Sequence, residues 1–340
     1  MENDVNFNKI MEGIILKLTG NSEMDFKILM DEYERYKSHK YSNEILRAIS
    51  RLMYDILPDD EKEKINQIPN NQNLGIRTMN REINFQIKMR NFDKALVLIE
   101  SVIKNMEDTG LYINDDKNNY YYFNNLLERL LYMETFKPEK EIRQIPENYS
   151  EVYFSYGNIL FEVKRYDEAK IVLEKAISYN PVNTVYLFEI GEIYKINKDW
   201  EIFLKINRDC LKYAYSNKSI ARCYRNFGYY YFEMEKYEIA MALYYLSINF
   251  DHEDKIAYSE IMYISEKTGL EIKAPDPQSV INILEDNDIK FGADNLILSI
   301  AYSIGREAQK TNQNEIAKFY FNIVYELTKD DEIKKIIDKL

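Results

Sequence analysis

The stretch that decides the fold is EVYFSYGNILFEVKRYDEAKIVLEKAISYNP, residues 151–181. It aligns without a gap with RCYRNFGYYYFEMEKYEIAMALYYLSINFDH, residues 222–252. The matched pairs are Tyr153 with Tyr224, Gly157 with Gly228, Tyr166 with Tyr237, and Ala169 with Ala240. Between these copies, Gly191 lies thirty-four residues after Gly157, and Gly228 follows thirty-seven residues later. A regular spacing of this length indicates a repeat fold in which each copy is one supersecondary unit.

Weaker copies extend the array on both sides. Near the carboxyl end, Gly305 and Ala317 are twelve residues apart, the same separation as between Gly157 and Ala169. Upstream, residues 78–106 form another copy, in which Phe92 and Ala95 are the turn signature and Ile83 replaces the glycine. These two segments are therefore predicted to be further helical hairpins.

One degenerate unit is expected between Gly228 and Gly305, which are seventy-seven residues apart. Residues 254–269 read as its first helix. The stretch DPQSVINILEDN reads as the second, with Asp276 as N-cap and Pro277 at the first helical position.

The amino-terminal residues show no repeat. Their periodicity predicts amphipathic helices over 4–19, 24–37 and 42–56, then a short helix after Pro58. The stretch NQIPNNQNLG, residues 66–75, has the composition of a linker. Further on, residues 118–134 are expected to form one helix, and KPEKEIRQIPEN interrupts the pattern before the clear copies begin.

The repeat resembles the tetratricopeptide repeat, a helix–turn–helix unit of about 34 residues. The positions that carry the resemblance in the first copy are Tyr153, Gly157, Tyr166, Ala169, Ala176 and Pro181. The third copy has His252 at the proline position. The middle copy has Phe203 where alanine is usual, which predicts a locally altered helix spacing.

The resemblance implies an all-α fold, a right-handed superhelix of helical hairpins over 76–340 that follows an N-terminal helical bundle or cap over 1–70. Only ten Gly and seven Pro occur in 340 residues, which also favours helices over a turn-rich β-fold. The clear repeats fall at about 150–183, 184–217, 221–254 and 298–331, and the degenerate ones at about 76–106, 117–149 and 255–290.

Three repeat glycines, Gly157, Gly191 and Gly228, fall in the middle of predicted helices, where glycine costs about 1 kcal/mol relative to alanine. The expected reason is that the partner helix approaches more closely than a side chain permits. Ala169 and Ala240 would supply the small faces opposite.

In this family the first helix of each repeat lines a concave groove that binds protein or peptide segments. The corresponding positions here are Glu151, Phe154, Asn158, Phe161, Phe188, Glu189, Glu192, Lys195, Arg222, Arg225, Asn226, Tyr229, Phe232, Tyr302, Arg306 and Gln309. Asn158 and Asn226 are common family residues, so each is either ordinary consensus or a specific ligand contact.

Two arginines distinguish the third copy. Arg can hold a carboxylate in bidentate fashion while an adjacent ring such as Tyr229 supplies apolar area. One hypothesis is that Arg222 and Arg225 receive an acidic or carboxylate-bearing segment; the alternative is that they pair internally with Glu189 and Glu192. The full basic set of the chaperone-tail carboxylate clamp is absent, which disfavours that ligand.

The aromatic stretch FGYYYF, residues 227–232, resembles a base-stacking strand but follows the helical period instead. That period turns Tyr224, Phe227 and Tyr231 inward and Tyr229 and Phe232 toward the groove. It is therefore predicted to be a repeat core that carries a small contact patch.

Several functional classes are not expected. A net charge of −12 and a pI near 5.0 argue against nucleic acid and anionic membranes as partners. Two Cys and two His, with no catalytic or metal-binding motif, predict no enzyme activity, metal or cofactor. The amino terminus lacks signal-peptide features, so we expect a cytoplasmic protein in which Cys210 and Cys223 are reduced and buried.

The predicted function is a protein-interaction scaffold or adaptor that binds a protein or peptide segment. The alternative is a regulatory peptide receptor of the quorum-sensing type, because residues 1–67 form a separate segment ahead of the repeats. That segment shows no helix-turn-helix with an exposed basic face.

Overall fold

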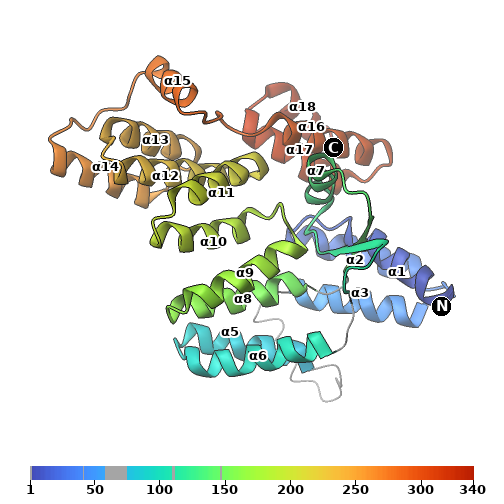
Figure 1. The fold of residues 1–340 in the computed structure, drawn as a ribbon. Coiled ribbons are helices and arrows are strands. Elements are labelled where there is room, and N and C mark those ends of the chain that lie inside the picture. Colours follow the sequence, from blue (N-terminus) through green and yellow to red (C-terminus); the bar gives the residue numbers. More distant parts are fainter. Residues whose placement is uncertain (1, 41, 58–74, 109–111, 146–147) are drawn as a thin grey trace. The chain divides into compact units, whose positions relative to one another are not determined.

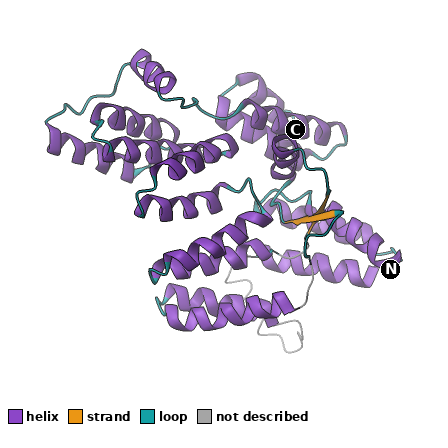
Figure 2. Cartoon of the chain, in the orientation of Figure 1, coloured by secondary structure: helices purple, strands orange, loops and turns teal. Residues whose placement is uncertain are grey.

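Helices make up almost all of the regular structure (Figures 1 and 2). The structure is a computed structural model that describes residues 2–40, 42–57, 75–108, 112–145 and 148–340. Within these ranges it has seventeen helices and two short strands, which confirms the all-α prediction. The chain forms two compact units, Met1–Pro181 and Val182–Leu340.

The first unit begins with three helices, α1 (Glu2–Ile15), α2 (Ser22–Tyr36) and α3 (Ser42–Ile56). All three were predicted from the amphipathic periodicity, and α3 packs against both α1 and α2. The short helix expected after Pro58 and the linker residues up to 74 lie outside the described residues.

A small β–α–β insertion takes the place of the single helix expected over residues 118–134. Strand β1 (Asn118–Tyr121) pairs in parallel with β2 (Glu141–Gln144), and helix α7 (Leu126–Phe136) connects them. The helix begins only after Asn125, whose side chain caps it by accepting a hydrogen bond from the Glu128 N–H at 3.0 Å. The tyrosine-rich residues before this cap favour a strand, and the predicted helix is correct only from Leu126 onward.

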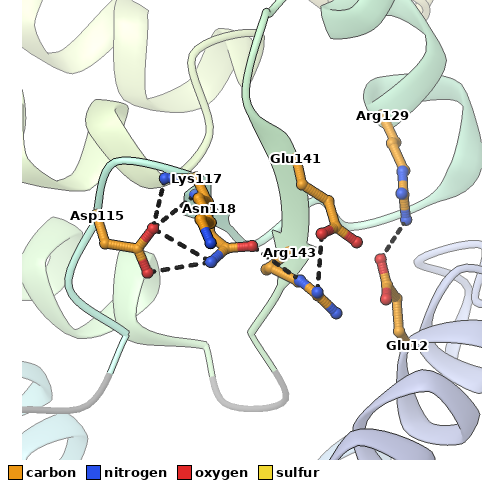
Figure 3. A network of polar contacts seen from close by, with 7 residues as sticks. All are labelled: Glu12, Asp115, Lys117, Asn118, Arg129, Glu141 and Arg143. Carbon is orange, nitrogen blue, oxygen red and sulfur yellow. Dashed lines mark hydrogen bonds and ion pairs between the residues drawn. The ribbon is translucent and has the colours of Figure 1, made fainter.

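Polar side chains fix the start of β1 against β2 (Figure 3). The Asp115 carboxylate accepts hydrogen bonds from the backbone N–H groups of Lys117 and Asn118, each at 2.7 Å. Arg143 on β2 donates to the Asn118 side chain at 3.2 Å and forms an ion pair with Glu141 at 2.8 Å. The two short strands are thereby held in register by side chains as well as by their backbone.

The insertion also connects the N-terminal helices to the rest of the first unit. Arg129 on α7 forms an ion pair with Glu12 on α1 at 2.8 Å, and both side chains are partly buried (Figure 3). Glu128, which is buried, accepts hydrogen bonds from the Asn124 N–H at 2.8 Å and from the Asn180 amide at 2.7 Å. Helix α7 is therefore held at one side by α1 and at the other by the end of a repeat helix.

Two helical hairpins complete the first unit. They are α5 (Gly75–Lys88) with α6 (Phe92–Asp108), and α8 (Tyr149–Glu162) with α9 (Tyr166–Tyr179). Helix α6 packs on α8, where the Tyr153 and Tyr156 hydroxyls donate to Glu107 and Glu100, each at 3.0 Å. Consecutive repeats thus stack on one another in this unit.

The second unit continues the pattern with the helices α10 (Thr184–Ile196), α11 (Trp200–Tyr213), α12 (Asn217–Glu233), α13 (Tyr237–Phe250), α14 (Lys255–Thr268), α15 (Pro277–Asp286), α16 (Asn295–Lys310), α17 (Asn314–Thr328) and α18 (Asp331–Ile337). Helices α10 and α11, α12 and α13, and α16 and α17 form hairpins, as expected for three of the clear repeats.

The degenerate unit is not a packed hairpin. Asp276 and Pro277 begin α15 as predicted, but α15 packs against α13 rather than against α14. Helix α14 ends at Thr268 and is capped by Gly269, which adopts the left-handed conformation with φ 77°. The following segment runs to Pro277 without regular structure and is too long for a tight hairpin turn.

Each hairpin turns through one residue in the left-handed region. These residues lie seven positions after the repeat glycine or its equivalent and are Arg90, Lys164, Lys198, Glu235 and Asn312, with φ between 55° and 63°. None of them is glycine, so the sequence gives little sign of this shared turn geometry.

The repeat glycines differ in how closely the partner helix approaches. A Cβ built on Gly157 would lie 2.6 Å from the Leu173 Cγ, and one on Gly228 would lie 3.1 Å from the Tyr244 ring. On Gly191 the nearest atoms belong to Ile206 at 3.7 Å and to Phe203 at 4.0 Å, which is ordinary contact. The expected close approach therefore holds at Gly157 and Gly228 but not at Gly191, where the middle hairpin is wider beside Phe203.

Alanine should have opposite effects at two of these glycines. Gly157→Ala should lower the free energy of unfolding by about 1–3 kcal/mol because the new methyl group overlaps Leu173. Gly191→Ala should raise it by up to about 1 kcal/mol, since alanine is the better helix former and has room there. Urea denaturation followed by circular dichroism would measure both; shifts in the same direction would contradict this account of the spacing.

Candidate protein-interaction face of the second unit

Arg222 connects α12 to α10 through three contacts. Its guanidinium lies 3.1 Å from the Glu189 carboxylate and 3.5 Å from that of Glu192. It also lies over the Phe188 ring, 4.5 Å from the ring centroid. Arg222 therefore makes the internal ion pairs that the alternative interpretation predicted.

A second connection between the same two helices runs through Lys195. Its ammonium group lies 2.5 Å from Glu192 and 4.8 Å from the centroid of the Tyr229 ring. Charge and aromatic surface thus alternate across the boundary between α10 and α12.

Arg225 connects α12 to the next helix, α14. It forms an ion pair with Asp254, whose carboxylate is almost fully buried. Asp254 is the N-cap of α14, accepting hydrogen bonds from the N–H groups of Ile256 and Ala257, and it is also hydrogen-bonded to the Ser247 hydroxyl at 3.1 Å. Arg225 is therefore committed to holding the start of α14, a partner that the sequence did not suggest.

Aromatic rings continue the connection farther along α14. The Phe232 ring lies 5.7 Å from that of Tyr263, and the Lys267 ammonium lies 4.8 Å from the Phe232 centroid. Phe232 is partly exposed and Tyr263 is exposed.

Together these contacts define one continuous surface, which we call the first-helix face. It consists of Glu189, Glu192, Lys195, Arg222, Arg225, Tyr229, Phe232, Ile256, Glu260 and Tyr263, on α10, α12 and α14. The last three residues were not predicted. Their spacing of four and then three residues on one helix is the signal that could have identified them.

Two predicted contact residues belong to the interior instead. Phe188 is 4% exposed beneath Arg222, and Asn226 is 8% exposed. The Asn226 amide donates to the Asn207 side chain at 3.1 Å, and Asn207 in turn donates to the Cys223 carbonyl at 2.9 Å. These buried side chains pack beneath the first-helix face. Their burial favours the interpretation of Asn226 as an ordinary family residue over that of a ligand contact.

The remaining predicted residues lie elsewhere. Phe154, Asn158 and Phe161 are partly exposed on α8 in the first unit, and the exposed Glu151 lies in the first turn of that helix. Tyr302 and Arg306 are exposed on α16, where Tyr302 contacts Phe321 and Arg306 donates to Gln309 at 3.0 Å. These contacts are local to their own hairpins and do not join the residues to the first-helix face.

The stretch FGYYYF divides between core and face as its period predicted. Tyr224, Phe227 and Tyr231 are buried, whereas Tyr229 and Phe232 are partly exposed. The two buried hydroxyls have a further role that the period does not reveal. Tyr224 donates to the Lys290 carbonyl at 2.9 Å and accepts from the Gly292 N–H at 2.6 Å, and Tyr231 donates to Asn287 at 2.7 Å. They hold the segment between α15 and α16 against α12.

Glu260 has an unusual environment for a carboxylate. Partial burial raises its pKa, and Lys195 lowers that pKa less than burial raises it. Lys195 is paired with Glu192, and within the described residues Glu260 has no ion-pair or hydrogen-bond partner. Among the charged side chains of the first-helix face in the described ranges, Glu260 is the one that forms no ion pair, although the Lys195 charge acts on it from a distance.

The described ranges contain two cysteines, and neither forms a disulfide. Cys210 and Cys223 are free and buried as expected, and burial raises the pKa of both thiols. No group of three or more His, Cys, Asp and Glu side chains in these ranges is placed to hold a metal ion. None of the helices described is long and apolar enough to cross a membrane.

A family model for the tetratricopeptide repeat matches residues 150–183. Residues 150–183 therefore form a tetratricopeptide repeat. The matched residues are the α8–α9 hairpin and coincide with the first clear copy found in the sequence, and the pairwise packing of the other helices fits the same architecture. No curated protein matches the chain. Tetratricopeptide repeats are generally protein-interaction modules, and such arrays are typically non-catalytic scaffolds.

Removing the Tyr224 hydroxyl should destabilise the second unit. In Tyr224→Phe the Gly292 N–H and the Lys290 carbonyl lose their buried partner, which should lower the free energy of unfolding by about 1–3 kcal/mol. Tyr230→Phe is the matched control, because the Tyr230 hydroxyl makes no hydrogen bond in the described part of the chain. Equal denaturation midpoints for the two variants would show that the hydroxyl does not hold the segment.

The raised pKa of Glu260 predicts a pH-dependent effect on stability. Between its ordinary value of 4.5 and the raised value, the unfolded chain binds fewer protons at this site than the folded chain, so stability falls as pH rises. Glu260→Gln should therefore be more stable than the wild type at neutral pH, and the difference should shrink as pH falls toward 4.5. Thermal unfolding over this range would test it, with Glu238→Gln on α13 as the control for the charge change.

Proposed function

We propose that this chain is a non-enzymatic scaffold or adaptor that binds a protein or peptide segment on the first-helix face. The observation that carries the proposal is the continuity of that face. Arg222 with Glu189, Lys195 with Tyr229, and Phe232 with Tyr263 join the alternate helices α10, α12 and α14 into one surface. Such surfaces on stacked helical repeats serve extended partners.

The chemistry of the face suits a polypeptide. Tyr229, Phe232 and Tyr263 offer apolar area with a polar edge, which is the composition enriched where proteins meet. Lys195 lies over the Tyr229 ring and Lys267 over the Phe232 ring, and these contacts restrict the two side chains. A partner would therefore lose little binding energy to ordering these two rings.

A catalytic role receives no support from the side chains. Both thiols are buried with raised pKa values, the opposite of what an activated cysteine nucleophile requires. Most charged groups of the face are committed to one another, as in Arg222 with Glu192 and Arg225 with Asp254.

The alternative role as a regulatory peptide receptor rested on a separate N-terminal segment. In the structure α1 is joined to α7 by the Glu12–Arg129 ion pair within the first unit. No observation on the first unit therefore favours that alternative over an adaptor.

Removing the aromatic rings of Tyr229 and Phe232 should reveal whether the first-helix face binds a peptide. Peptides selected from a phage-displayed random library on the immobilised full chain would be synthesised with a fluorophore and titrated by anisotropy. Tyr229→Ala combined with Phe232→Ala should weaken their binding by about tenfold or more, as expected when aromatic anchors of an interface are removed.

Phe85→Ala on α5 is the control, since it removes an exposed ring from a helix of the first unit. Circular dichroism would establish that both variants fold. Peptides that lose affinity for the control but bind the double variant normally would contradict the proposed location.

A further inference from the structure

The charges around α14 are unbalanced. Residues 251–271 carry six acidic and two basic side chains. Asp254 is neutralised by Arg225, and Lys267 lies over the Phe232 and Tyr237 rings. The helix itself carries two acidic and two basic side chains, so the excess of negative charge lies in the residues that flank it. Within the helix, Glu260 is the acidic side chain that lies on the face proposed to bind a partner.

Glu260 lies between two exposed apolar side chains on the same stripe of the helix. Ile256 precedes it by four residues and Tyr263 follows by three; they are 60% and 53% exposed. The stripe is directed toward α12, because the Tyr263 ring contacts Phe232 and Glu260 acts electrostatically on Tyr229 and Tyr244. A partly buried carboxylate is thus framed by an aliphatic side chain on one side and aromatic rings on the other.

The stripe is accessible to a partner. Ile256 and Tyr263 remain exposed, although Tyr263 contacts Phe232. Helix α15 packs against α13 and does not form a hairpin with α14.

We propose that the partner segment presents a lysine or arginine side chain to Glu260, flanked by apolar side chains that cover Ile256 and Tyr263. This inference rests on the proposed function and specifies the partner as a basic, apolar polypeptide segment. The carboxylate would accept charge-assisted hydrogen bonds from the cation, and the exposed ring of Tyr263 would supply a cation–π contact.

An acidic segment suits the same face poorly. To reach Arg225 it would have to displace Asp254, and a buried carboxylate without its counter-ion is strongly unfavourable. Arg222 is likewise shared between Glu189 and Glu192. A cation at Glu260 needs no existing ion pair to be broken.

The test uses peptides selected from a phage-displayed random library on the immobilised full chain. Lysine or arginine between apolar residues should be enriched among those that depend on Tyr229 and Phe232. Glu260→Gln should weaken their binding by about tenfold, the usual weight of a charge-assisted contact. Glu238→Gln, which removes the same charge from the second helix α13, should leave binding unchanged.

A double-mutant cycle tests whether Glu260 contacts the cation of the peptide directly. Replacing the selected peptide's cation by glutamine should weaken binding to the wild type by the same factor but add little to the effect of Glu260→Gln. Independent, additive effects of the two changes would overturn the proposed pair.

The remaining outcomes separate the two proposals. Neutral or acidic peptides that depend on Tyr229 and Phe232 but not on Glu260 would overturn the cation contact and leave the adaptor function standing. A selection that yields no peptide dependent on Tyr229 and Phe232 would overturn both.

Discussion

The close approach of paired helices at small residues determines the rest of the structure. At Gly157, Gly228 and Gly305 the side chains of Leu173, Tyr244 and Phe321 occupy the space where a Cβ would be. Each contact brings the two helices of a hairpin together and thereby sets where its first helix lies relative to the next. At Gly191 the contact is relaxed, with Ile206 at 3.7 Å and Phe203 at 4.0 Å from the Cβ position, and α10 and α11 still pack together. The position of α12 against α13, and with it the central part of the first-helix face, follows from this packing.

The hairpins could be predicted from the sequence because small residues at a fixed spacing indicate that two paired helices approach each other closely. The sequence did not reveal the β–α–β insertion. No visible break separates the helical pattern of residues 126–134 from the tyrosines before it, which form a strand. The turn residues were also missed. Lys164, Lys198 and Glu235 adopt a left-handed conformation that their side chains do not favour, and only the surrounding helices impose it.

The candidate site shows a similar division. The helical period correctly separated Tyr224 and Phe227 from Tyr229, because the period alone decides which face a residue occupies. Which charged side chains form ion pairs depends on how the helices lie relative to one another. Arg225 pairs with Asp254 only because α14 begins beside it. Glu260 was missed for the same reason: its lack of a partner is a property of the packed helices.

The missing hairpin partner of α14 has a consequence for how this helix moves. Helices that pack on both sides open only with the whole unit, whereas a helix with one free side can open locally at a smaller free-energy difference. Beyond its packing on α13, α14 is held at its cap by Arg225 and along its length by the contact of Tyr263 with Phe232. The amide hydrogens of α14 should therefore exchange with solvent faster than those of α12. A partner that covers Ile256 and Tyr263 would slow that exchange. Part of its binding free energy would be used to order the helix.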